Sequence, residues 1–166
     1  MDFINYTNLA ELHPDDDWRI AVHESGHAIT GARNDCIFEY VEIGPNEHGA
    51  VKWINSPTDL KNQGFTIEEL RYWQMIYAAG AAAEHIVFNE IRMHAIRCDM
   101  ICHLRVDLRC KCGPVDLFES AIERAIRILL QSKIDLECVA REVMQKKRLQ
   151  YDDVCALIRV RPPWER

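Results

Sequence analysis

The sequence lacks the segments that would carry a protein into or across a membrane. No stretch approaches the ~18–20 consecutive apolar residues of a membrane-spanning helix. Residues 1–9 contain neither the basic region nor the apolar core of a secretory signal peptide. We therefore expect no membrane span and a cytoplasmic location.

The motifs of several common function classes are also missing. No G-x-x-x-x-G-K-S/T segment occurs, so the chain has no P-loop ATPase of its own. The seven cysteines are odd in number and lack the C-x-x-C…C-x-x-C spacing of a structural zinc site. We expect reduced thiols in place of a disulfide framework. The net charge of −6 disfavours nucleic acid as a partner, because phosphate binding needs a basic surface.

The length and composition are those of one globular domain. A chain of 166 residues can bury a sizeable core without covalent crosslinks. We find no internal repeat and no low-complexity segment that would divide it. The expected organisation is a lead-in over residues 1–13, a single domain over 14–160 and a tail over 161–166.

Two long helices are marked by their ends. Acidic residues are favoured at the positive N-terminal end of a helix. Their position here predicts a helix from about Asp16 to Ala32 or Arg33. The segment Thr66-Ile67-Glu68-Glu69 is a capping box and predicts the start of another. Apolar residues at helical spacing extend this second helix to about Asn89.

The other patterns predict a mainly α fold with one small β hairpin. Residues 37–43 and 50–54 are typical of strands, and the turn chemistry between them favours a hairpin. A further helix is expected over 96–110, and two or three more over 115–160. We interpret Val139, Val143 and Leu149 as the apolar face of one of these later helices.

The segment His23-Glu24-Ser25-Gly26-His27 is an H-E-x-x-H motif inside the first predicted helix. Its histidines are four residues apart, so both imidazoles project from one face and can reach one zinc ion at ~2.0–2.1 Å. Glu24 is rotated about a third of a turn and lies beside such a metal, where it can act as general base. Gly26 costs ~1 kcal/mol against alanine in a helix, which indicates close packing there.

A catalytic zinc site needs a third protein ligand, with the fourth position left to water. Residue type alone leaves several candidates downstream of the motif: Glu84, His85, His94, Cys98, Asp99, Cys102 and His103. Glu84 lies on the apolar stripe of its helix and needs a partner if buried. That partner is either the spare N–H of a metal-bound histidine or an arginine. His48, His85 and His94 have no spacing that favours metal binding.

Three segments resemble the FtsH-type zinc peptidases, the peptidase domains of membrane-bound AAA+ proteases. Residues 21–29, AVHESGHAI, resemble the family's A-x-H-E-A-G-H-A helix. Residues 76–90, IYAAGAAAEHIVFNE, resemble its L-G-G-R-A-A-E-E-L-x-F-G helix. Residues 94–100, HAIRCDM, fall where the family has T-G-A-S-N-D-L, whose aspartate is the third zinc ligand. The resemblance therefore implies Asp99 as the third ligand, beside the two histidines.

The resemblance covers about residues 18–160 and carries further expectations. It implies a helical, zincin-like FtsH-type fold, Zn²⁺ as cofactor and a zinc-dependent metalloendopeptidase that hydrolyses short or unfolded polypeptides. His23 and His27 would hold the metal and Glu24 would be the catalytic base. Family Gly-Gly-Arg is replaced here by Ala79-Gly80-Ala81, and Ser-Asn before the aspartate by Arg97-Cys98. Other candidates for the third ligand are His103, Cys98 and Cys102.

Two alternatives to an independent peptidase stay open. One is an inactive scaffold that binds zinc, or no metal, and contacts a partner. The other is a latent subunit that works with a separate ATPase, and a homo-oligomer is equally open. For an active enzyme, an exposed edge strand of the hairpin would bind an extended peptide by adding it to the sheet.

Overall fold

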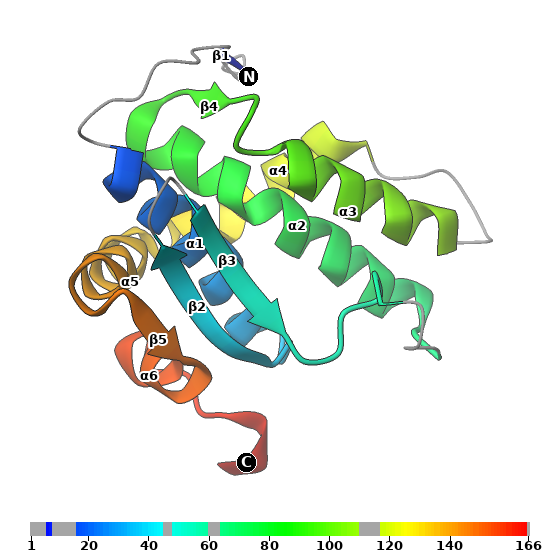
Figure 1. The fold of residues 1–166 in the computed structure, drawn as a ribbon. Coiled ribbons are helices and arrows are strands. Elements are labelled where there is room, and N and C mark those ends of the chain that lie inside the picture. The colour runs from blue at the N-terminus through cyan, green and yellow to red at the C-terminus, as the bar shows by residue number, and fades with distance from the viewer. Residues whose placement is uncertain (1–5, 8–15, 45–47, 60–63, 110–116, 166) are drawn as a thin grey trace.

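The computed structural model describes residues 6–7, 16–44, 48–59, 64–109 and 117–165. These residues form a mainly α structure (Figure 1). Its helices are α1 (Asp16–Arg33), α2 (Ile67–Phe88), α3 (Arg97–Arg109), α4 (Phe118–Leu130), α5 (Lys133–Lys146), α6 (Tyr151–Leu157) and the 3-10 turn η1 (Pro163–Glu165). Its strands are β1 (Tyr6–Thr7), β2 (Phe38–Gly44), β3 (His48–Trp53), β4 (Ile91–Arg92) and β5 (Arg148–Gln150).

The two long helices agree closely with the prediction from their ends. Helix α1 occupies the expected span, and α2 begins after the capping box, in which the Thr66 hydroxyl accepts from the Glu69 amide at 3.2 Å. The Glu69 carboxylate accepts in return from the Thr66 amide at 2.7 Å. Helix α2 ends at Asn89, whose left-handed backbone (φ 56°) closes the last turn.

Helices α1 and α2 cross at small residues. A Cβ atom on Gly26 would lie 2.4 Å from the Ala79 carbonyl oxygen and 2.7 Å from the Ala83 Cβ. Real Cβ atoms do not approach other atoms so closely, so glycine is required at this crossing. The close packing predicted for Gly26 is confirmed.

The sheet is larger than the predicted hairpin. Strands β2 and β3 form that hairpin, which is confirmed, but β5 pairs antiparallel with the other edge of β2. The assignment of Leu149 to a helical face was therefore wrong, because Leu149 is the buried middle residue of β5. Lys147 ends α5 with a left-handed φ of 64° and turns the chain into the strand. Sheet order is β3-β2-β5, so β3 is an edge strand.

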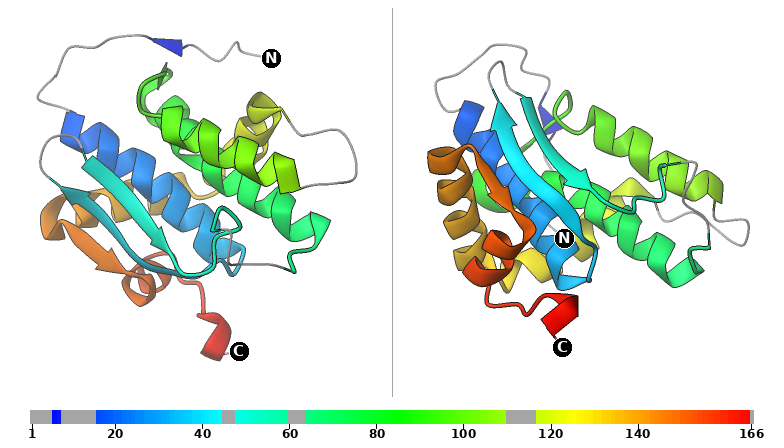
Figure 2. Two further views of the ribbon diagram at one scale, coloured as in Figure 1. Left: turned by 45° about the vertical axis from the view of Figure 1, so that its right-hand side comes forward. Right: turned by 60° about the horizontal axis from the view of Figure 1, so that its bottom comes forward.

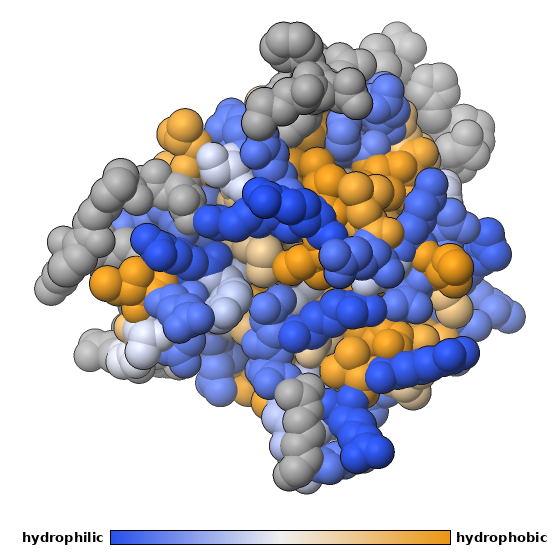
Figure 3. Space-filling view, turned by 180° about the vertical axis from the view of Figure 1, so that it is seen from behind, coloured by the Kyte–Doolittle hydropathy of each residue, from blue (hydrophilic) through white to orange (hydrophobic). Residues whose placement is uncertain are grey.

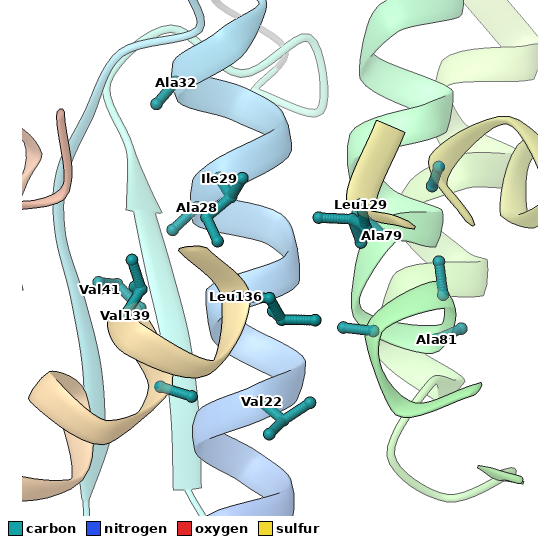
Figure 4. Close-up of a cluster of buried hydrophobic side chains, with 14 of the residues drawn as sticks. Val22, Ala28, Ile29, Ala32, Val41, Ala79, Ala81, Leu129, Leu136 and Val139 are labelled. Atoms are coloured by element: carbon teal, nitrogen blue, oxygen red, sulfur yellow. The ribbon is translucent and has the colours of Figure 1, made fainter. Parts of the chain in front are cut away.

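The hydrophobic core surrounds α1. In Figure 4, apolar side chains of α1 lie between those of the sheet and α5 on one side and those of α2 and α4 on the other. The labelled members, all fully buried, are Val22, Ala28, Ile29, Ala32, Val41, Ala79, Ala81, Leu129, Leu136 and Val139. This packing on several sides fixes the position of the H-E-x-x-H helix within the core.

A short parallel pair was not predicted. Tyr6 and Thr7 of β1, within the expected lead-in, align with Ile91 and Arg92 of β4. The rest of that lead-in, and the cysteines at 110 and 112, lie outside the described residues.

The surface carries some apolar side chains outside the core. Seen from behind, hydrophobic residues form separate groups among hydrophilic ones (Figure 3). Leu108 and Ile134 are the most exposed large apolar side chains of the described residues, at 84% and 85%. None of the described helices is long and apolar enough to cross a membrane.

Candidate metal centre

Three side chains from α1 and α3 converge on one point. His23 Nε2 lies 3.1 Å from His27 Nε2 and 3.0 Å from Asp99 Oδ2, and His27 Nε2 lies 3.3 Å from the same oxygen. Two ligands bound tetrahedrally to zinc at ~2.0 Å lie about 3.3 Å from each other. The spacing of the three donor atoms therefore matches a shared metal ion, and the group could hold one.

The opposite ring nitrogens have partners of their own. His27 Nδ1 lies 2.7 Å from the Ile76 carbonyl oxygen, which can only accept, so Nδ1 carries the proton and Nε2 keeps its lone pair. His23 Nδ1 lies 2.8 Å from Glu84 Oε1, which favours the same tautomer. Two lone pairs and the Asp99 carboxylate thus face one another, an arrangement that requires a cation or added protons between them.

The ionisation of the group reflects this requirement. Burial disfavours a charged imidazole and so lowers the pKa values of both histidines. The Asp99 carboxylate raises both pKa values, and Glu84 raises that of His23 as well. The net result is a raised pKa for both residues. Burial likewise opposes ionisation of Asp99, yet the charge of His27 and the hydrogen bonds from both rings lower its pKa. In the metal-free protein, protons supply the positive charge that a divalent cation would otherwise provide.

Gly80 of α2 provides the space for this convergence. A Cβ atom there would lie 2.4 Å from His23 Nε2 and 2.5 Å from His27 Nε2. Any other residue would therefore fill the space in which the two donor atoms meet. The sequence did not connect Gly80 with the metal-binding group, although a glycine in the middle of a helix is a sign of close approach.

Glu84 contacts both of the partners that the sequence left as alternatives, a histidine of the metal-binding group and an arginine. It is fully buried, and Oε1 pairs with His23 while Oε2 accepts from Arg19 at 3.2 Å and from the Arg92 backbone amide at 3.1 Å. Burial alone would raise the pKa of Glu84, but these partners, led by His23, lower it. An ionised carboxylate is thereby fixed behind the first histidine, where it orients the ring.

Glu24 lies beside the histidines and against β3. It is 9% exposed, and a Cβ atom on Gly49 would lie 2.6 Å from Glu24 Cγ and 2.7 Å from Oε1. Burial raises the pKa of Glu24, and the neighbouring histidines only partly offset this. Among the described residues, no hydrogen bond or ion pair engages its carboxylate. Glu24 therefore remains available to a molecule in the cleft.

The remaining candidates for the third ligand lie outside the group. Cys98 and Cys102 line the same cleft, but in the described part of the chain only Asp99 joins the two histidines. His103 is buried elsewhere, with its ring 5.3 Å from that of Phe118.

The group opens into a cleft of about 570 Å³ between β3, α1, α2 and α3. All six residues of β3 line it, and within the described residues this strand pairs only with β2 (Figures 1 and 2). His48 and His94 also line the cleft, which their positions in the sequence did not predict, whereas His85 does not. The metal-binding group thus lies beside the open edge of a strand.

No protein-family model matches the chain, and a search of curated proteins finds no match.

Proposed function

We propose that this protein is a zinc-dependent metalloendopeptidase of the FtsH type, which hydrolyses peptide bonds in short or unfolded polypeptides. The observation that supports this most strongly is the convergence of His23, His27 and Asp99 donor atoms to within 3.3 Å, with Glu24 beside them in the cleft. Two imidazole nitrogens and one carboxylate, with an open fourth position, are the ligands that catalytic zinc takes.

Zinc, when bound, polarises the scissile carbonyl and increases the acidity of water. Glu24 takes the proton of the attacking water and returns it to the leaving amine. Burial raises the pKa of Glu24 in the metal-free protein, and the positive charge of a bound zinc ion would act in the opposite direction and favour the carboxylate that a general base needs. Glu84 and the Ile76 carbonyl keep both histidines turned toward the metal.

The open edge of β3 supplies a means of holding the substrate. An extended peptide that pairs with this edge forms main-chain hydrogen bonds, which do not depend on its side chains. Folded proteins rarely offer a free extended strand, so this mode selects short or unfolded polypeptides. Glu24 contacts Gly49 of the same strand, which sets the catalytic base next to the peptide backbone.

The test measures metal content and cleavage on one preparation. Wild-type protein, purified without chelators, should contain one zinc per chain and cleave casein. Glu24→Gln keeps the size and buried position of the side chain, so it should retain zinc while cleavage falls about 10²–10⁴-fold. Asp99→Ala should lose zinc.

The alternatives give different results in the same test. One zinc per chain without cleavage would favour an inactive scaffold, or a latent subunit if activity returns with a separate ATPase partner. No zinc binding even after reconstitution would overturn the proposed function.

A further inference from the structure

Three hydroxyl groups meet in the cleft, apart from the metal-binding group. Tyr77 Oη lies 2.6 Å from Ser56 Oγ and 3.3 Å from Thr58 Oγ1, and the Ser56 and Thr58 oxygens are 2.6 Å apart. Tyr77 belongs to α2, and the other two belong to the segment that follows β3 (Figure 1). All three line the cleft. We call them the hydroxyl cluster.

The hydroxyl cluster marks one end of the cleft. Tyr77 lies three residues before Gly80, so it projects from the same side of α2, one turn away. The Ile76 carbonyl contacts His27, which places the cluster beyond the second histidine. The opposite end of the cleft is charged, with Arg19 and Arg92 among its lining residues.

The end of the cleft that holds the hydroxyl cluster combines aromatic rings with neutral hydroxyl groups. Trp53 lines the cleft here, and the Tyr77 ring packs 5.7 Å from that of Trp73. The Tyr77 hydroxyl is neutral at physiological pH, as for any tyrosine, and burial raises its pKa further, to about 12. A neutral hydroxyl both donates and accepts hydrogen bonds and rotates to suit its partner. The end of the cleft therefore matches a compact, uncharged side chain with a polar tip.

We propose that Tyr77, Ser56 and Thr58 form a specificity subsite for an uncharged, hydrogen-bonding side chain, such as threonine, near the scissile bond. The inference rests on the proposed peptidase function. The segment that carries Ser56 and Thr58 continues directly from β3, so a peptide paired with β3 extends toward the cluster. The hydroxyls already pair with one another, so the preference comes from one additional hydrogen bond that a threonine hydroxyl forms and an aliphatic side chain of the same shape does not.

Threonine and valine provide the test, because they have nearly the same shape. Peptides carry one or the other at each of the two positions on either side of the scissile bond. Wild-type kcat/KM should favour threonine at one position by about 3- to 10-fold, the effect of one net hydrogen bond. Tyr77→Phe should reduce that ratio toward one, with zinc content retained. The control is Tyr72→Phe, which removes an exposed hydroxyl from the same helix and should keep the ratio.

The same ratio is measured as Kd on zinc-loaded Glu24→Gln protein, with and without Tyr77→Phe, so that binding is read without turnover. A threonine preference in Kd with no wild-type cleavage would refute the proposed function and support the subsite. Cleavage with a ratio near one at every position would overturn the subsite alone. An unchanged ratio in Tyr77→Phe with a lower urea midpoint would also overturn it, because the hydroxyls would then only anchor the segment after β3.

Discussion

Replacing Gly80 with alanine separates metal binding from folding. In the interior of a helix, alanine is favoured over glycine by ~1 kcal/mol, so the change should help α2 as an isolated helix. At this position, however, the added Cβ atom would lie 2.4 and 2.5 Å from the Nε2 atoms of His23 and His27. The gain in helix propensity is therefore opposed by a steric clash with the two nitrogen atoms that would bind the metal.

The size of the effect follows from the distances. Contacts below 3.0 Å essentially never occur for Cβ atoms, so the two nitrogens must move by at least about 0.6 and 0.5 Å. Metal–ligand distances tolerate about ±0.2 Å. A shift of two to three times that tolerance should weaken zinc binding by at least the ~10- to 100-fold seen when supporting residues are removed.

The assay is a competition titration of zinc against a coloured chelator, beside urea unfolding of the metal-free protein. Gly26→Ala serves only as the comparison for loss of folding stability, because its Cβ atom meets the Ala79 carbonyl and should destabilise the metal-free fold by about 1–3 kcal/mol. Wild-type zinc affinity in Gly80→Ala would refute the convergence of the two nitrogens above α2. Unfolding of Gly80→Ala to the same extent as Gly26→Ala would show that the clash acts on folding.

Three other changes test the support of the site. Glu84→Gln should weaken zinc binding about 10- to 100-fold in the same titration, and unchanged affinity would contradict its role behind His23. Thr66→Ala should cost about 1 kcal/mol in urea unfolding, since it removes the cap of α2. In EDTA, the raised pKa values of His23 and His27 contribute stability that is full below about pH 6.5 and is lost as pH rises through those values. The urea midpoint should therefore fall from pH 6 to pH 8, while stabilisation by added zinc increases; a midpoint that rises in EDTA would contradict this.

Features set by neighbouring residues could be predicted from the sequence. The spacing of His23 and His27 places them on one helical face whatever surrounds the helix. The capping box at Thr66 is equally local, and the start of α2 matched it. Asp99 is different, because it lies 76 residues from His23 and came from the family resemblance alone.

Features that depend on contact between distant segments were missed. Leu149 was assigned to a helix because its apolar character fits either period, and only the pairing of β5 with β2 decides between them. An arginine was among the expected partners of Glu84, but Arg19 itself, 65 residues away, could not be identified. The contact between Ser56 and Tyr77, which joins a loop to a helix, was not predicted. Neither pair has a fixed spacing, since its geometry depends on how the helices and the sheet pack.

The crossing of α1 and α2 explains why the site depends on a helix outside the motif. Ile76, Gly80 and Glu84 of α2 are spaced by four residues, the same period as the two histidines, so the antiparallel helices keep in step across the contact. Glu84 then meets the first histidine, the Ile76 carbonyl meets the second, and Gly80 lies beneath both. A rotation of α2 by one residue, about 100°, would remove all three contacts at once. Changes at the Gly26 crossing should therefore weaken metal binding as well as folding, although no residue of that crossing is a ligand.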